Sequence, residues 1–163
     1  MHKWLGISAL IVVLDQLTKL VMTRALALHE SVEITSFFNF VLVHNRGAAF
    51  SFLSNAGGWQ REFFIAIALG AAVWIAWLLR RHSAETRFAL ALSLILGGAI
   101  GNVIDRLLHG AVVDFLDFHA FGWHWPAFNV ADIGISCGAI LLVWDALAPK
   151  RAPIPQSERR PGV

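Results

Sequence analysis

The sequence predicts an all-α membrane protein with four transmembrane helices and a small β-rich, outward-facing segment. Of its 163 residues, 57% are hydrophobic and only 15% are charged, whereas a soluble domain carries about 25% charged residues. The apolar residues lie in four blocks, each about as long as the 17–25 residues that a helix needs to cross a bilayer. A soluble helical bundle is the alternative, but four such blocks leave no polar face for water. The expected spans are residues 4–22, 63–79, 88–104 and 127–147.

The first span has some features of a cleavable signal peptide, because residues 25–27 (ALA) after it resemble a cleavage site. Asp15, Gln16 and Lys19 interrupt the apolar run, however. A pure targeting segment has no use for an ion pair, so we expect an uncleaved first helix. We also expect a single membrane-embedded domain over residues 1–148.

The basic residues predict the orientation, since Lys and Arg gather in cytoplasmic loops. We expect both termini in the cytoplasm, a disordered cytoplasmic tail over residues 149–163, and the connections 23–62 and 105–126 on the outer side. This topology explains the net charge of +2, and no run of interleaved basic and aromatic residues supports binding to nucleic acid. The basic side chains that define the cytoplasmic side are Lys3, Arg80, Arg81, Arg87, Lys150, Arg151, Arg159 and Arg160.

The two outward connections have different compositions. In the first, residues 32–34 and 37–43 alternate weakly and are rich in Val and Phe, so short strands are expected there. The second is rich in aromatic residues, and three of its side chains fit the aromatic belt at a membrane interface. These are Trp123, Trp125 and Phe128.

Polar side chains in or beside the spans are the candidates for chemistry. An ionised carboxylate in hydrocarbon is expensive, so it pairs, becomes protonated or faces water. Asp15 and Lys19 are four residues apart on one helical face and are expected to form an ion pair. Near the outer ends of the third and fourth spans, further polar groups share one face and one depth. These are Asn102, Asp105 and Arg106 in the third span, and Asn129 and Asp132 in the fourth.

Two carboxylates that share one proton would provide the chemistry of an aspartyl protease. By depth, the candidates are Asp105, Asp114, Asp117 and Asp132. Asp105 is expected to be an ion-pair or hydrogen-bonding residue, and Asp117 is expected in a wet loop. Asp114 has apolar neighbours on both sides and Asp132 lies in a span, so these two are favoured. The spacing alone leaves the choice open.

Other site chemistries find little support in the sequence. The histidines show no metal-ligand spacing, so no metal site is expected, and the proposed acid–base chemistry needs no organic cofactor. Cys137 is the only cysteine, which excludes a disulfide within the chain. We expect it to be a buried packing residue.

Two other classes of protein remain open from the residues alone. A small proton-coupled transporter also carries intramembrane charges, but it places them near the midplane and contains paired repeats, which are not found here. A non-enzymatic scaffold could be held by pairs of small residues that let helices approach closely, but it would not need aspartates at one depth. The small-residue pairs are Gly97 with Gly101 and Gly134 with Gly138.

Five motifs make the chain resemble the bacterial lipoprotein signal peptidases (signal peptidase II), an aspartyl protease family. They come in the order of that family and cover nearly the whole folded chain: residues 14–19 (LDQLTK), 45–51 (NRGAAFS), 97–106 (GGAIGNVIDR), 112–115 (VVDF) and 128–132 (FNVAD). The resemblance implies that Asp114 and Asp132 are the catalytic dyad. It also implies that six other residues line or brace the site, namely Asp15, Lys19, Asn45, Asn102, Arg106 and Asn129.

The resemblance further implies an integral-membrane endopeptidase of the bacterial inner membrane, with its active site near the outer, periplasmic leaflet. The implied substrates are prolipoproteins whose lipobox cysteine already carries diacylglycerol, and the cut falls just before that cysteine. Membrane lipids are the other implied partner, the cyclic peptide globomycin is the implied inhibitor, and a monomer is expected. The catalytic domain would then be residues 1–148.

Overall fold

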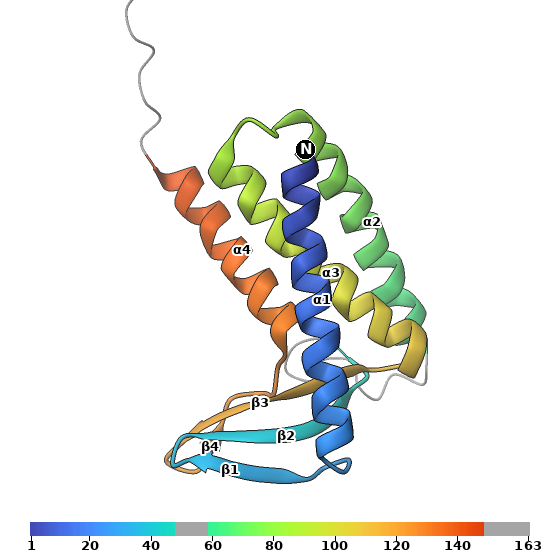
Figure 1. The fold of residues 1–163 in the computed structure, drawn as a ribbon, viewed down its shortest axis with the longest axis vertical. Coiled ribbons are helices and arrows are strands. Elements are labelled where there is room, and N and C mark those ends of the chain that lie inside the picture. Colours follow the sequence, from blue (N-terminus) through green and yellow to red (C-terminus); the bar gives the residue numbers. More distant parts are fainter. Residues whose placement is uncertain (48–58, 149–163) are drawn as a thin grey trace, which may run out of the picture.

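The computed structural model describes residues 1–47 and 59–148 (Figure 1). The expected tail over residues 149–163 and the second half of the NRGAAFS motif, residues 48–51, lie outside the described residues. Four helices form a bundle, and a small antiparallel sheet lies across one of its ends (Figure 1). All four helices are long and apolar enough to cross a membrane. The predicted fold class is therefore confirmed.

The helices are α1 (His2–Ala25), α2 (Gln60–Arg81), α3 (Thr86–His109) and α4 (Val130–Leu147). The first three contain the expected spans, whereas α4 begins at Val130 rather than at residue 127. Asn129 is the N-cap of α4, and its side-chain oxygen accepts the N–H of Asp132, which satisfies a first-turn amide that has no partner within the helix. Phe128 just before it pairs with Leu116 as extended chain.

Helix α3 is the centre of the bundle. It packs against α1, α2 and α4, and 61% of its most apolar window is buried, compared with 17%, 11% and 17% for α1, α2 and α4. Glycine permits the closest contacts: a Cβ on Gly101 would lie 2.5 Å from an Asp15 carboxylate oxygen, and one on Gly138 would lie 2.6 Å from the Ala91 carbonyl oxygen. The close helix approach expected from the small-residue pairs is confirmed at these two positions.

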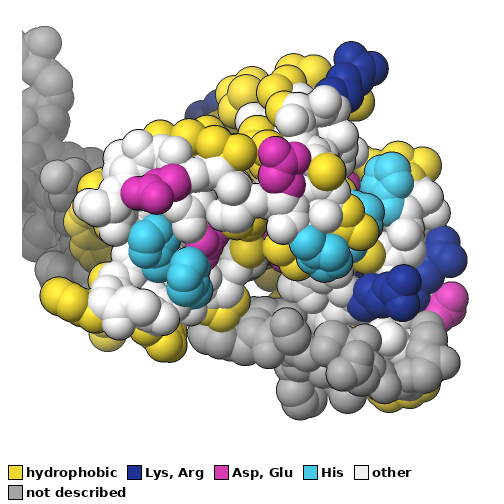
Figure 2. Space-filling view, turned by 90° about the horizontal axis from the view of Figure 1, so that it is seen from below, with side chains coloured by type: hydrophobic (Ala, Val, Ile, Leu, Met, Phe, Trp, Pro, Cys, Tyr) yellow, Lys and Arg dark blue, Asp and Glu magenta, His cyan; other side chains and the backbone are white. Residues whose placement is uncertain are grey.

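The sheet contains β1 (Ser31–Thr35), β2 (Phe38–Asn45), β3 (Val112–Ala120) and β4 (Trp123–His124), in that spatial order. The first two strands confirm the expectation for the first outward connection. Strand β3 was not expected, because polar and apolar residues do not alternate at its start. The structure explains the missing alternation, since the first four residues of β3 are all buried. The face of the sheet that points away from the bundle carries charged and histidine side chains across its middle (Figure 2).

Two expectations about single residues are wrong. Asp117 does not lie in a wet loop: it is 6% exposed, because it lies within β3 and accepts a hydrogen bond from Asn39 Nδ2 at 2.9 Å. Cys137 is exposed on α4 rather than buried, because that face of α4 is not covered by another helix. Exposing this side chain to lipid would cost little free energy, because a thiol is only weakly polar.

Candidate active site

The two favoured aspartates meet where the sheet joins the bundle. Asp114 lies on β3 and is 2% exposed, while Asp132 lies half-buried in the first turn of α4. Asn129 links them: its Nδ2 donates to Asp114 Oδ1 at 2.6 Å, and its Oδ1 accepts the Asp132 N–H at 3.0 Å. One carboxamide therefore holds both members of this aspartate pair.

Asn45 is the second donor to Asp114. Val43 is directly opposite Asp114 in the β2–β3 register, so Asn45 is a diagonal neighbour on the same face of the sheet, and its Nδ2 lies 3.1 Å from Asp114 Oδ2. The Asn45 oxygen accepts the Gly47 N–H at 3.0 Å. Arg106 in turn donates from Nη2 to the Gly47 carbonyl at 2.9 Å. Arg106 thus fixes the backbone that orients the Asn45 amide.

Asn102 is the donor to the other aspartate. Its Nδ2 lies 2.8 Å from Asp132 Oδ1. Its own oxygen accepts from Lys19 Nζ at 3.1 Å and from Asn129 Nδ2 at 3.4 Å. Because an ammonium group can only donate, this contact determines which end of the Asn102 amide faces the aspartate. Three carboxamides thus donate to the two carboxyl groups, Asn45 and Asn129 to Asp114 and Asn102 to Asp132.

A buried ionic group, the Lys19 triad (Asp15, Lys19 and Asp105), lies beside the aspartate pair. Lys19 Nζ is 2.8 Å from Asp15 Oδ2 and 2.7 Å from Asp105 Oδ2. The two acids also hold the backbone: Asp15 Oδ1 accepts the Ala131 N–H at 2.9 Å, and Asp105 Oδ2 accepts the Val113 N–H at 3.0 Å. These two amides belong to the residues immediately before the two aspartates. The triad therefore ties together the two backbone segments that carry the pair.

The structure brings together all eight residues implied by the resemblance and adds two that were not among them. The ion pair expected between Asp15 and Lys19 is present, and Asp105 is an ion-pair residue as expected, with Lys19 as its partner. Gln16 was missed: its Nε2 donates to Asp105 Oδ1 at 2.9 Å and to Asp15 Oδ2 at 3.2 Å. The sequence does contain a signal that identifies Gln16 as a candidate, because it lies in the same helical turn as Asp15 and Lys19.

The environment raises the pKa of Asp114 to about 7, from an ordinary value of 3.8. Burial is the main cause and the nearby negative charge of Asp132 is the second, while the N–H donors from Asn45 and Asn129 oppose both. A carboxyl group that titrates near neutral pH can both give and take a proton. In residues 1–47 and 59–148, no group of three or more His, Cys, Asp or Glu side chains could hold a metal ion.

The chain is similar to proteins of one family along most of its length. The family model described as signal peptidase (SPase) II matches residues 7–148. A lipoprotein signal peptidase of Ralstonia nicotianae is 61% identical over 144 residues, which are 88% of this chain and 83% of that protein. One from a Janthinobacterium species is 58% identical over 147 residues, which are 90% and 89% of the two chains.

A solved structure has the same overall arrangement of helices and sheet. A bacterial membrane enzyme whose structure was determined by the in meso method at 2.3 Å resolution superimposes with a TM-score of 0.81 and 31% sequence identity. The match covers 94% of this chain and 95% of that one. The four helices and the sheet are thus an arrangement that also occurs in an experimental structure.

Proposed function

The chain belongs to the signal peptidase II family, and we propose that Asp114 and Asp132 are the catalytic dyad with which it removes signal peptides from prolipoproteins. The observation that carries the proposal is the double contact of the Asn129 carboxamide, which holds both aspartates from one side chain. The pKa of Asp114, raised to about 7, supports a proton shared between two close carboxyl groups.

The dyad would cleave the peptide bond with a water molecule held between the two carboxyl groups. The ionised aspartate takes a proton from this water as the water oxygen attacks the scissile carbonyl carbon. The protonated aspartate donates a hydrogen bond, and then its proton, to the carbonyl oxygen, which gives a neutral gem-diol. The first aspartate passes its proton to the leaving amine as the C–N bond breaks, and the second recovers a proton from the diol.

The supporting residues would keep this geometry around a buried Asp114 and a half-buried Asp132. Asn45 and Asn129 hold Asp114, and Asn102 holds Asp132. Arg106 acts through the Gly47 carbonyl. The Lys19 triad acts through the two backbone amides that precede the dyad. None of these groups is free to move without disturbing another, which is the preorganisation that catalysis needs.

We propose that the substrates are prolipoproteins whose cysteine carries diacylglycerol, cut just before that cysteine. The site is near one end of the four spans, so two acyl chains in the outer leaflet would hold the cleavage point at this depth. Both the N-terminus and the last turn of α4 lie at the opposite end of the bundle from the sheet (Figure 1). Together with the basic residues at the connection between α2 and α3, where Arg80 and Arg81 end α2 and Arg87 lies in the first turn of α3, this supports cytoplasmic termini in a bacterial inner membrane.

The dyad is tested with purified Asp114→Asn and Asp132→Asn variants and a diacylglyceryl-modified prolipoprotein. Each variant is expected to lose at least about 10²–10⁴-fold in cleavage rate, because neither amide can exchange a proton. Thermal unfolding should stay close to that of the parent chain. Asp145→Asn, a change of the same kind near the far end of α4, should cleave normally, and globomycin should block cleavage by the parent. Normal turnover in either dyad variant rejects the assignment.

A further inference from the structure

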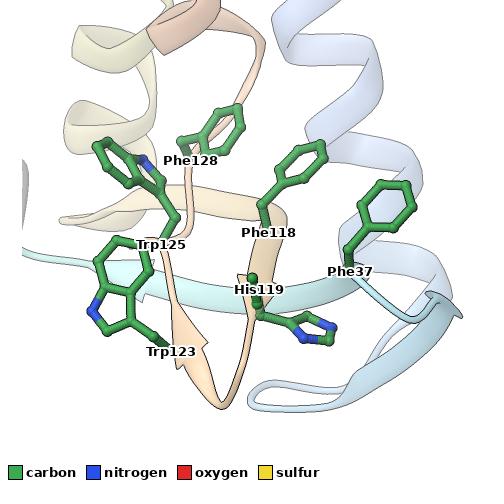
Figure 3. A pocket seen from close by; sticks show the side chains of 7 residues that line it. Phe37, Phe118, His119, Trp123, Trp125 and Phe128 are labelled. Atoms are coloured by element: carbon green, nitrogen blue, oxygen red, sulfur yellow. The ribbon is translucent and has the colours of Figure 1, made fainter.

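An apolar pocket of about 440 Å³ lies where β3 turns into β4, a size in the range of about 300–1,000 Å³ that small-molecule sites occupy. Its wall is built by Phe37, Phe118, His119, Trp123, Trp125 and Phe128 (Figure 3). Apart from the indole N–H groups of the two tryptophans, the polar group of this wall is the His119 ring, whose Nε2 lies 3.3 Å from Asn39 Oδ1. This aromatic pocket therefore suits an apolar ligand.

The hairpin beside the pocket exposes aromatic side chains that the fold does not use. Trp123 is 60% exposed, and Phe121, at the tip, is fully exposed. Phe121 and Gly122 both have positive φ, 53° and 77°, in a two-residue turn for which Asn-Gly is the usual sequence. A bulky side chain is unfavourable in this backbone conformation. Phe121, Trp123 and Trp125 (48% exposed) together form an exposed apolar cluster on this hairpin, and a cluster of this kind marks a contact outside the chain.

The direction of the side chains indicates what that contact is. The rings of Phe37, Phe118 and Phe128 extend toward the ends of the helices (Figure 3). Because these helices are long and apolar enough to span a membrane, the bilayer is expected on that side. Phe128 immediately precedes the cap of α4, and one turn into that helix Ile133 is exposed. Phe128 thus places the pocket directly beside the first turn of a membrane span, at the level where aromatic side chains such as Trp prefer the lipid interface.

We propose that the aromatic pocket holds an acyl chain of an outer-leaflet phospholipid. Phe118 lies four residues after Asp114 on the same face of β3, about 13 Å along the strand at its usual rise. The bound lipid is therefore a neighbour of the active site without being part of it, and it fixes the depth of β3 in the membrane. This inference rests on the proposed outward orientation of the sheet but not on the proposed dyad, because the quenching measurement needs no peptidase activity.

The test uses the two pocket tryptophans as reporters in the full chain, reconstituted in phosphatidylcholine vesicles whose acyl chains are brominated near the headgroup end. The emission lost in the double variant Trp123→Phe/Trp125→Phe identifies the signal of these two side chains. We expect brominated lipid to quench this signal, and iodide in the water to leave it unchanged. Quenching by iodide without quenching by the lipid would overturn the proposal.

A pocket-filling variant separates a bound chain from general proximity to lipid. Ala120 lines the pocket, so Ala120→Leu is expected to abolish most of the quenching by brominated lipid. The matched change Ala84→Leu, in the α2–α3 turn, should leave it intact. Phe37→Ser, which opens the pocket wall, is the second variant and should give the same loss. Undiminished quenching in both pocket variants rejects a bound acyl chain.

The occupant is identified by competition. Unbrominated, diacylglyceryl-modified prolipoprotein is added to the vesicles in an amount equimolar to the reconstituted chain. We expect the quenching to persist, because phospholipid holds the pocket while the substrate occupies the dyad. Loss of quenching would assign the pocket to the substrate instead, and a dependence on protein density in the vesicles would assign it to a second copy of the chain.

Discussion

At the scale of single residues, the orientation of three carboxamides determines the properties of the aspartate pair. Asn45, Asn102 and Asn129 each have their oxygen occupied by an N–H group, so each amide nitrogen is available to an aspartate. An Asp in place of any of them would add a negative charge beside the pair. A Leu would leave a buried carboxylate oxygen without a donor, which costs about 1–3 kcal/mol or more for a charged group.

The pH dependence of the enzyme is predicted from Asp114. Its pKa is raised from 3.8 to about 7, so the proposed dyad would keep its shared proton below about pH 7 and lose it above. The cleavage rate is therefore expected to fall as the pH rises through about 7. At a pH between 3.8, the pKa of Asp114 in the unfolded chain, and about 7, its pKa in the folded chain, the folded chain binds more protons. The free energy of unfolding is therefore also expected to fall as the pH rises from about 4 to 7.

The cleavage rate is measured across this pH range for the parent chain. Thermal unfolding is measured across the same range for the parent chain and for Asp114→Asn. The asparagine variant cannot titrate at this position, so its unfolding temperature should depend less on pH in the same window. An equal dependence in both chains would show that Asp114 is not the group responsible.

Sequence reasoning at this scale reduced the choice to four aspartates and favoured Asp114 and Asp132, but spacing alone could not exclude the other two. Asp105 is paired with Lys19, and Asp117 contacts both Asn39 and His124. Lys19 and Asn39 come from segments distant in the sequence. Spacing along one helix or strand cannot reveal such contacts. The same holds for Gln16, whose role depends on the approach of α3 to α1.

At the scale of elements, the Lys19 triad joins three helices and a strand. Asp15 and Lys19 come from α1 and Asp105 from α3, and the amides that the acids hold belong to α4 and β3. The sequence predicted the helices well because their hydrophobic blocks are long. It did not predict β3, whose buried start lacks alternation, and it placed the start of α4 too early because the cap at Asn129 was not recognised.

Lys19→Met is expected to show what the triad does. The change leaves two buried carboxylates without their cation, and breaking a buried ion pair costs about 3–5 kcal/mol. Both aspartate segments should then be less well held, so kcat should fall while KM changes little, because the triad is not exposed to substrate. Thermal unfolding and steady-state kinetics measure the two effects. Glu62→Gln, an exposed acid at the start of α2, is the control and should alter neither.

Asp105→Asn separates positioning from simple stability. Lys19 keeps Asp15 as its partner in this variant, and the asparagine oxygen can still accept the Val113 N–H. A smaller loss than in Lys19→Met is therefore expected in both stability and kcat. If kcat were unchanged in Lys19→Met while stability fell, the triad would have a structural role alone.

At the scale of the whole molecule, composition and the distribution of charge predicted four spans and one polar end. The orientation follows from the same features and is tested by labelling. In a Cys137→Ala background, Ser36→Cys in the β1–β2 turn should react with a membrane-impermeant maleimide in intact cells stripped of their outer membrane. Ala84→Cys in the α2–α3 turn should react only after lysis. The reverse pattern would invert the proposed topology.

The N-cap of α4 has a consequence for biosynthesis. Asn129 and Asp132 belong to the α4 segment, whereas Asp15 and Lys19 both belong to α1 and neutralise each other within one helix. Helix α1 can therefore enter the bilayer with these two charges already paired, and the proposed pair of Asp114 and Asp132 is assembled only when α4 packs against α3. We therefore expect a chain truncated before α4 to have no peptidase activity.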